Sequence, residues 1–429
     1  MSFRQSCLVV CALACAATMS VVSRAYGQSD DPQHHMDMNM SMPAAGWQLM
    51  QDGIVFVEFN RQGGSRGGSE LVAPNWWMGA ATRETSRGRL TFTGMLSLDP
   101  ATVGKDGYRE IFQAGEALNG RPLIDRQHPH DLFMQLAAIW RMPIAASTGL
   151  TFAGGPVGEP ALGPVAFMHR ASAADNPAAP LGHHTFDSSH IAFGVVTAAI
   201  DHGPWVVEGS LFNGREPDEN RWDFDFARLD SVSARVWYRP ARDWEIQASS
   251  GRLVNPEQLE PGNVVRSTAS ASWTRTEGAA IASVTAAYGR NDSDHGARQA
   301  FFLEGARHTA SNTLYTRFET LQVDTVLLQT DLFVPDPSAS LKSPLTAFTV
   351  GGVRHVGSWR GFEGGIGADL TVYAVPADLQ PAYSNHPISL HLFFRVRPPA
   401  GSMGRMWNMR MSQPMAGHAG DMPMNHPMP

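Results

Sequence analysis

The sequence has few charged residues, and its only cysteines lie close to the N-terminus. Asp, Glu, Lys and Arg make up 17% of the 429 residues, against about 25% in an average globular domain. The three cysteines, Cys7, Cys11 and Cys15, fall in a segment with the features of an export signal. A mature chain without cysteine excludes disulfides, zinc–thiolate sites, thiol catalysis and blue-copper centres.

Other absences remove further classes of protein. The 33 Lys and Arg residues are outnumbered by 40 Asp and Glu, and a net charge of −7 excludes a basic nucleic-acid binder. Beyond the N-terminus there is no run of about 18 apolar residues, the minimum for a spanning helix. The chain has no nucleophile elbow, phosphate loop or His-Glu-x-x-His motif. Ser188, His190 and Asp187 could be assembled into a triad, but such sets arise by chance, so we expect no enzyme and no organic cofactor.

Residues 1–27 have the pattern of a secretory signal peptide. Arg4 supplies the positive charge, residues 7–22 are apolar, and Ala25 and Gly27 are small residues suited to a cleavage site. We predict removal of this segment; a lipoprotein signal ending at Cys15 is the alternative.

Residues 47–397 alternate apolar and polar side chains with a period of two. In residues 231–239, for example, Val232 and Val236 share one strand face while Arg235 lies on the other. Helical periodicity is nearly absent, and residues 108–118 are the best candidate for a short helix. The fold class predicted is therefore all-β.

Short turns and long connections alternate along this region. The turns fall near residues 85–87, 143–148, 202–203, 240–242, 276–278, 309–311 and 357–360; the long connections include residues 100–131, 155–188 and 291–298. This alternation is typical of an up-and-down antiparallel outer-membrane β-barrel, here of about 16 strands, with roughly 12–18 plausible. Aromatic pairs at strand ends, Trp76–Trp77 and Trp237–Tyr238, suit an interfacial girdle. A soluble sandwich, propeller or solenoid is the alternative.

The final predicted strand, residues 388–397, places Leu392 and Phe394 opposite His391 and Arg395 in its alternation. It resembles the terminal strand of bacterial outer-membrane proteins, although a tail of residues 398–429 follows it. An even strand count puts both termini on one side, which in this class is the periplasm. We therefore expect a protein of the Gram-negative outer membrane, with membrane lipid as one partner.

Methionine and histidine are concentrated in an arm, residues 28–46, and in the tail, residues 398–429. Because the neighbouring residues in these segments are Asp, Asn, Ser, Pro and Gly, with no apolar face, we expect both termini to be disordered and their methionines not to pack in a core. The arm reads HHMDMNMSM, and four of the 20 methionines lie in it and eight in the tail. Thioether and imidazole together favour Cu(I) over zinc or nickel, although chance low-complexity enrichment is an alternative. The predicted ligands are His34, His35, Met36, Met38, Met40 and Met42 in the arm, and Met403, Met406, Met409, Met411, Met415, His418, Met422, Met424, His426 and Met428 in the tail.

A second group of histidines falls in the two longest connections. The strings RQHPHD, GPVAFMHR and LGHHTFDSSH carry these histidines, with Asp131 and Asp187 inside the strings and Asp125 directly before the first. The group could bind a metal, or it could close the mouth of the barrel through hydrogen bonds. Its members are His128, His130, His169, His183, His184 and His190.

The plan of signal, Met/His-rich arm and β-barrel resembles the copper-resistance protein B family of outer-membrane proteins. The specific match is the HHMDMNMSM arm, and the loop strings resemble those of an uncharacterised group of bacterial envelope proteins. The resemblance implies a role in copper sequestration or export, with periplasmic copper ions or a copper carrier protein as partners. A general solute channel with incidental tails, and a barrel carrying a His-rich loop metal site, are the alternative functions.

Overall fold

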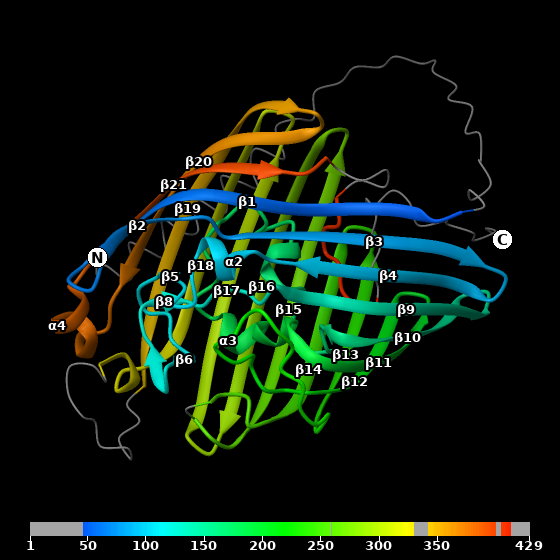
Figure 1. The fold of residues 1–429 in the computed structure, drawn as a ribbon, viewed down its shortest axis with the longest axis horizontal. Helices are drawn as coiled ribbons and strands as arrows, with labels where there is room; N and C mark the ends of the chain where they lie inside the picture. Colours follow the sequence, from blue (N-terminus) through cyan, green and yellow to red (C-terminus); the bar gives the residue numbers. More distant parts are fainter. Residues whose placement is uncertain (1–45, 259, 330–341, 400–404, 413–429) are drawn as a thin grey trace.

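The chain forms one closed antiparallel β-barrel. The computed structural model describes residues 46–258, 260–329, 342–399 and 405–412. Its large sheet has 17 strands, of which β2 and β3 both pair with β1 as one interrupted strand, so the barrel has 16 crossings. The barrel closes where β1 pairs with β21, from Val55 opposite Val396 to Arg61 opposite Leu390. The predicted fold class and strand number are confirmed (Figure 1).

The wall strands follow one another around the barrel in chain order. They are β1 (Gln48–Gln62), β2 (Gly68–Val72), β3 (Asn75–Thr85), β4 (Gly88–Leu96), β9 (Phe133–Ala145), β10 (Thr148–Gly158), β11 (Ala192–His202), β12 (Trp205–Phe212), β13 (Ser231–Ala241), β14 (Trp244–Val254), β15 (Asn263–Glu277), β16 (Ala280–Ser293), β17 (Gly296–His308), β18 (Asn312–Asp324), β19 (Lys342–Trp359), β20 (Phe362–Ala374) and β21 (Ile388–Arg397).

Small elements occupy the connections. The described helices are α2 (Asp99–Thr102), α3 (His183–Phe186) and α4 (Gln380–Tyr383), with single turns η1 (Phe167–His169), η2 (Ser188–His190), η3 (Leu327–Gln329) and η4 (Ala377–Leu379). Two short ladders pair β5 (Tyr108–Arg109) with β8 (Arg126–Gln127), and β6 (Glu116–Leu118) with β7 (Arg121–Leu123). None of the helices in the described part of the chain is long and apolar enough to cross a membrane.

All seven short turns lie where the sequence predicts them, at the end of the barrel where β1 begins. Two other expectations were wrong. The connection at residues 291–298 is a tight hairpin, because β16 and β17 stay paired up to Ser293 opposite Gly296, where a glycine with φ +90° permits the turn. Residues 108–118 are not helical: Phe112 and Gly115 have positive φ, which interrupts a helix, and both ends join small ladders.

The strands place apolar side chains outside and polar side chains inside. On β21, Leu392 and Phe394 are exposed on the outer face, while His391 and Arg395 are buried in the lumen. Trp205 stacks on Tyr238 near the short turns, at 4.3 Å between ring centroids, as expected of an interfacial girdle. Trp76 and Trp237, expected in that girdle, instead face the lumen with 8% and 2% exposure. Successive side chains of a strand point to opposite faces, and the next residue of each pair, Trp77 or Tyr238, points away from the lumen.

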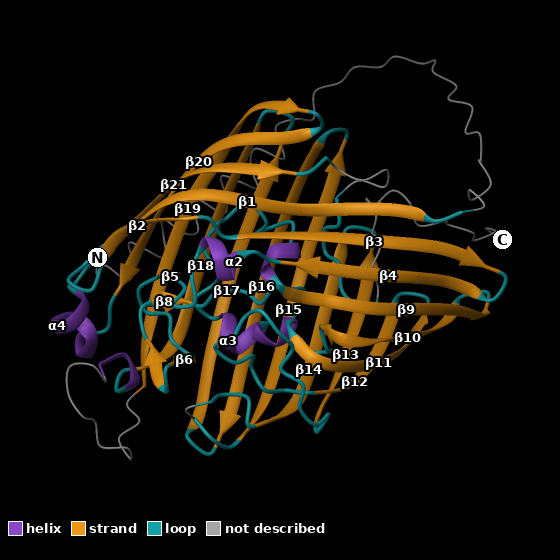
Figure 2. Ribbon diagram, viewed as in Figure 1, coloured by secondary structure: helices purple, strands orange, loops and turns teal. Residues whose placement is uncertain are grey.

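The lumen is filled by the connection between β10 and β11. Almost every residue from 159 to 183 is buried, and contacts attach the segment to several wall strands. Arg170 pairs with Glu304 of β17 at 2.7 Å, the Gly163 amide donates to Ser249 of β14 at 2.9 Å, and Asp175 pairs with Arg395 of β21. In Figure 2 the helices α2 and α3 lie within the outline of the orange barrel. We call residues 159–191 the plug.

The beginning of the C-terminal tail also lies inside the barrel. Arg405 pairs with Asp52 of β1 at 3.0 Å and with Glu363 of β20 at 2.6 Å. The Arg410 guanidinium lies 3.8 Å from the centroid of the Trp237 ring, which supplies a cation–π contact. Residues 405–412 are therefore not part of a free tail, contrary to expectation.

Candidate functional site

Five of the six predicted loop histidines gather in the lumen, towards the end with the long connections. His128 and His130 come from the segment before β9, whereas His183, His184 and His190 come from α3 and η2 of the plug. The His183 ring lies 5.3 Å from that of His190, 5.6 Å from His184 and 6.1 Å from His128, between centroids. His130 lies 5.8 Å from His190. We call these five residues the histidine cluster.

The Nδ1 atom of every ring in the cluster faces an oxygen. His183 Nδ1 lies 2.7 Å from Asp187, and His190 Nδ1 lies 2.8 Å from the Asp187 carbonyl oxygen. The remaining contacts are His130 with Asp99 at 2.9 Å, His184 with Glu216 at 3.0 Å, and His128 with Glu116 at 3.3 Å. Such contacts fix the orientation of an imidazole and direct its other nitrogen away from the partner.

That other nitrogen is buried without a partner in three of the rings. Among the described residues, the Nε2 atoms of His128, His130 and His190 have no hydrogen-bond partner. A buried polar atom without a partner costs about 1–3 kcal/mol, so it needs an explanation. Imidazoles with a fixed Nδ1 and a free Nε2 are the arrangement that metal-binding histidines adopt.

Burial keeps most of the cluster neutral. Burial, assisted by the neighbouring imidazoles of His183 and His130, lowers the pKa of His190 to about 3, and burial lowers the pKa of His128 well below its usual value. Burial also lowers the pKa of His183, against the opposing effect of Asp187. The free Nε2 atoms of His128 and His190 are therefore available as lone-pair donors at neutral pH.

His184 differs from the other members. Burial would lower its pKa, but the carboxylates of Glu216 and Glu257 raise it well above the usual value. One donor atom of each of these three residues lies within 4.8 Å of the others, close enough for one cation to bind all three. One oxygen of Glu257 is buried without a hydrogen-bond partner among the described residues.

His169, the sixth predicted loop histidine, lies apart from the cluster. Its ring packs edge-on against Trp76 of β3, at 5.1 Å between centroids, and its carbonyl oxygen accepts the amide of Asn408 at 2.7 Å. Phe167, two residues earlier in η1, instead contacts His130, His183 and His190. The turn η1 thus separates His169 from the cluster.

Three predicted tail ligands are described, and all three are buried in the lumen. Met406 and Met409 pack with Trp76 and Met78, while Met411 packs in another apolar cluster with Phe212. The expectation that these methionines have no apolar surroundings was wrong, because the tail enters the barrel. The other predicted ligands, His34, His35, Met36, Met38, Met40, Met42, Met403, Met415, His418, Met422, Met424, His426 and Met428, and the signal peptide lie outside the described residues.

Sequence reasoning missed the carboxylates that orient the histidines. Asp99 and Glu116 lie in the connection between β4 and β9, 31 and 12 residues before their partners His130 and His128, and Glu257 lies in the connection after β14, so no local spacing links them to the histidines. Arg221 was also missed; its guanidinium pairs with Glu116 and, at 3.2 Å, with Asp131. The only available signal was that all of them fall in long connections on the same side of the predicted barrel.

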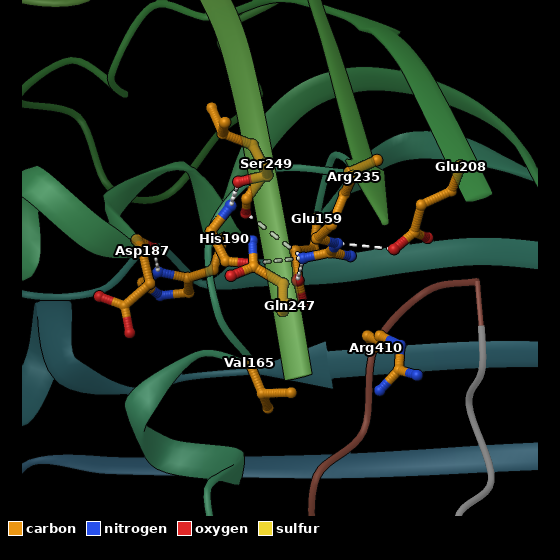
Figure 3. A network of polar contacts seen from close by, with 12 residues as sticks. Glu159, Val165, Asp187, His190, Glu208, Arg235, Gln247, Ser249 and Arg410 are labelled. Atoms are coloured by element: carbon orange, nitrogen blue, oxygen red, sulfur yellow. Dashed lines mark hydrogen bonds and ion pairs between the residues drawn. The ribbon is translucent and has the colours of Figure 1, made fainter. Parts of the chain in front are cut away.

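A polar network joins the plug to the wall beside the cluster. Figure 3 shows Arg235 of β13 between Glu208 of β12 and Glu159 of the plug, at 2.6 Å and 3.1 Å. Arg235 also donates to the Gly163 carbonyl oxygen at 2.9 Å. This salt-bridged network holds in place the segment that carries His183, His184 and His190.

No family model and no curated protein matches the chain. Among solved structures, it is similar to OprB of Pseudomonas putida at high pH, with a TM-score of 0.50, 11% identity, and coverage of 82% of this chain and 94% of that one. A loop L8 deletion mutant of OmpT, an outer membrane protein of Vibrio cholerae, has a TM-score of 0.47 and 10% identity, with coverage of 82% of this chain and 99% of that one. An anion-selective porin from Comamonas acidovorans has a TM-score of 0.46 and 11% identity, with coverage of 82% of this chain and 100% of that one.

At such low identity the likeness to OprB concerns the fold alone. Together with the closed 16-strand wall and its apolar outer face, it defines the class: the protein is an outer-membrane β-barrel.

Proposed function

We propose that this protein binds copper inside its plugged lumen and contributes to copper tolerance, by sequestration or export. The observation that carries the proposal is the histidine cluster, in which three buried Nε2 atoms have no partner among the described residues while every Nδ1 faces an oxygen. Imidazole suits copper, zinc, iron and nickel. The Met/His-rich arm and tail of the sequence favour copper among these.

The proposal includes an orientation. Both described ends of the barrel wall, at β1 and β21, lie on the side of the short turns, which are periplasmic in this class. The arm and the end of the tail would then meet copper ions, or a copper carrier protein, in the periplasm. This arrangement agrees with the proposed kinship to copper-resistance protein B barrels, which rests on the arm.

The same geometry supports a non-catalytic role. The histidine cluster is enclosed by Phe167 and by carboxylates that already contact its rings, which leaves little room for an organic substrate. A general solute channel has less support, because residues 159–183 of the plug are packed within the lumen. We therefore propose holding or passage of a metal ion rather than diffusion of solutes.

The test is copper stoichiometry in the purified full-length protein. Replacing His128, His130 and His190 by alanine should remove one copper equivalent, measured by elemental analysis after dialysis against a weak chelator. The matched control replaces the exposed His202 and His295 by alanine and should change nothing. Equal copper content in all three proteins would overturn the proposal.

A second measurement covers the case in which the triple variant does not fold. Electron paramagnetic resonance of the Cu(II)-loaded wild type should show coupling to several imidazole nitrogens. A spectrum without nitrogen coupling would count against the histidine cluster as the site.

A further inference from the structure

Many luminal methionines belong to one apolar cluster, which borders His169 through its member Trp76. Seven of them belong to a single buried cluster: Met50, Met78, Met95, Met134, Met168, Met406 and Met409. They come from β1, β3, β4 and β9, from the plug and from the tail. Methionine commonly fills irregular gaps in a core, and this cluster also contains aromatic and aliphatic side chains, but its methionines come from six separate segments of the chain.

The backbone brings several of these side chains together in register. Met78 of β3 lies opposite Met95 of β4 and opposite Asp52 of β1. The Met406 amide donates to the Asp52 carboxylate at 3.2 Å, which places the tail beside Met78. Asn408, next to Met409, holds the carbonyl oxygen of His169.

His169 supplies a nitrogen donor at the same place. Its side chain is 6% exposed, and its Nδ1 atom has no hydrogen-bond partner among the described residues. Burial lowers the pKa of His169 to about 4, so the ring is neutral at pH 7. A neutral imidazole among thioethers is a soft donor set, which suits Cu(I) or Ag(I) rather than a hard cation.

We propose that His169, Met78 and Met406, with the neighbouring luminal methionines, form a second metal site that takes a soft monovalent cation. The proposal rests on the proposed function in metal handling, but it uses residues distinct from the histidine cluster. The single turn η1 lies between the two sites: Phe167 contacts the histidine cluster, and Met168 and His169 belong to the soft site. The tail reaches the soft site from the side of the short turns.

The test titrates the full-length protein with Ag(I), which mimics Cu(I) without redox chemistry. The variant Met78→Leu/Met406→Leu/His169→Phe keeps side-chain volume approximately and should lose one Ag(I) equivalent, or weaken its binding by at least about tenfold. The control Met411→Leu removes a thioether that is equally buried in the tail but lies in a different cluster, and it should keep all equivalents.

Undiminished Ag(I) binding in the triple variant, or an equal loss in the control, would overturn the soft site. The variant His128→Ala/His130→Ala/His190→Ala should retain this equivalent, so failure of the soft site and failure of the histidine cluster are distinguishable. If the triple variant does not fold, methyl NMR of methionine-labelled wild type decides. Ag(I) should shift the ε-methyl signals of Met78 and Met406, and unshifted signals would overturn the proposal.

Discussion

Each histidine of the cluster is oriented by a neighbour that also limits its movement. His184 has an additional constraint, because a Cβ added to Gly115 would lie 2.8 Å from three atoms of its ring. Gly115 has φ +145°, a conformation that other residues rarely adopt. Glycine is therefore needed at position 115 for two reasons: the backbone approaches the His184 ring closely, and it has a positive φ.

Gly115→Ala should displace the His184 ring and weaken metal binding by about 10–100-fold, the range seen when the support of a ligand is disturbed. Isothermal titration with Cu(II) would measure the loss. Gly120→Ala is the matched control, since Gly120 also has a positive φ but no atom lies within 4 Å of its would-be Cβ. An equal effect of both changes would trace the loss to backbone strain rather than to His184.

Asp175 attaches the plug to the wall through three charged or ionisable partners. Its side chain is fully buried, and it pairs with Arg395, with Arg397 at 3.6 Å, and with His308 at 3.1 Å. Removing one partner of a buried pair leaves uncompensated charge, which is strongly destabilising.

Asp175→Ala should lower the free energy of unfolding by about 3–5 kcal/mol, measured by urea titration in detergent micelles. Asp201→Ala breaks a surface pair in which the Arg141 side chain is 45% exposed, and it should cost less than about 1 kcal/mol. Similar losses for both variants would show that the plug contributes little to stability.

At the scale of the strand, β21 closes the barrel and presents its apolar face to lipid. Leu392 lies near its middle, opposite Phe59 of β1 and Ala368 of β20. Trp359 lies at the end of β19, beside a short turn, and is 68% exposed.

Leu392→Arg should destabilise the folded barrel by about 2–4 kcal/mol, because the charge would sit near the bilayer midplane. Trp359→Arg should cost about 0–1 kcal/mol, because its site lies near the interface. Reversible unfolding in lipid vesicles would compare them. A larger loss of stability for Trp359→Arg than for Leu392→Arg would show that Trp359 does not lie near the membrane interface.

The wall could be predicted from the sequence because alternation with a period of two is a local property. Val232 and Arg235 are on the expected faces, and Leu392 and His391 are likewise on opposite sides of β21. Alternation determines which residues share a face. Two adjacent aromatic residues in a strand always lie on opposite faces, so Trp237 faces the lumen while Tyr238 does not.

The site could be predicted only in part. Histidine spacing identified five rings that do meet, but not the partners Asp99 and Glu257. Asp99 lies 31 residues before His130 in the same connection, and Glu257 comes from a different connection than His184. A similar limit applies to the tail. Met406 and Met409 lie in a segment without strand or helix periodicity, and their burial depends on long-range entry into the lumen that no local pattern reports.

At the scale of the whole molecule, the plug separates this barrel from an open porin. Barrels of 16–18 strands can leave an aqueous channel, whereas here the described residues of the plug are packed against β13, β14, β16, β17 and β21.

The intact protein should therefore show little single-channel conductance in planar bilayers, and replacing residues 160–181 by a short Gly/Ser linker should increase it severalfold. Removing ring nitrogens alone, in His128→Ala/His130→Ala/His190→Ala, leaves the plug in place and should leave conductance low. Large stable channels formed by the wild type would favour the general solute channel.

The position of the tail has a consequence for biogenesis. Residues 405–412 contact Asp52 on β1, Trp237 on β13, Glu245 on β14 and Glu363 on β20, strands that come from both ends and the middle of the wall. These partners are brought together only after β1 has met β21. This segment, which follows the last wall strand in the sequence, can therefore dock only into a closed barrel, so its docking would report that closure is complete.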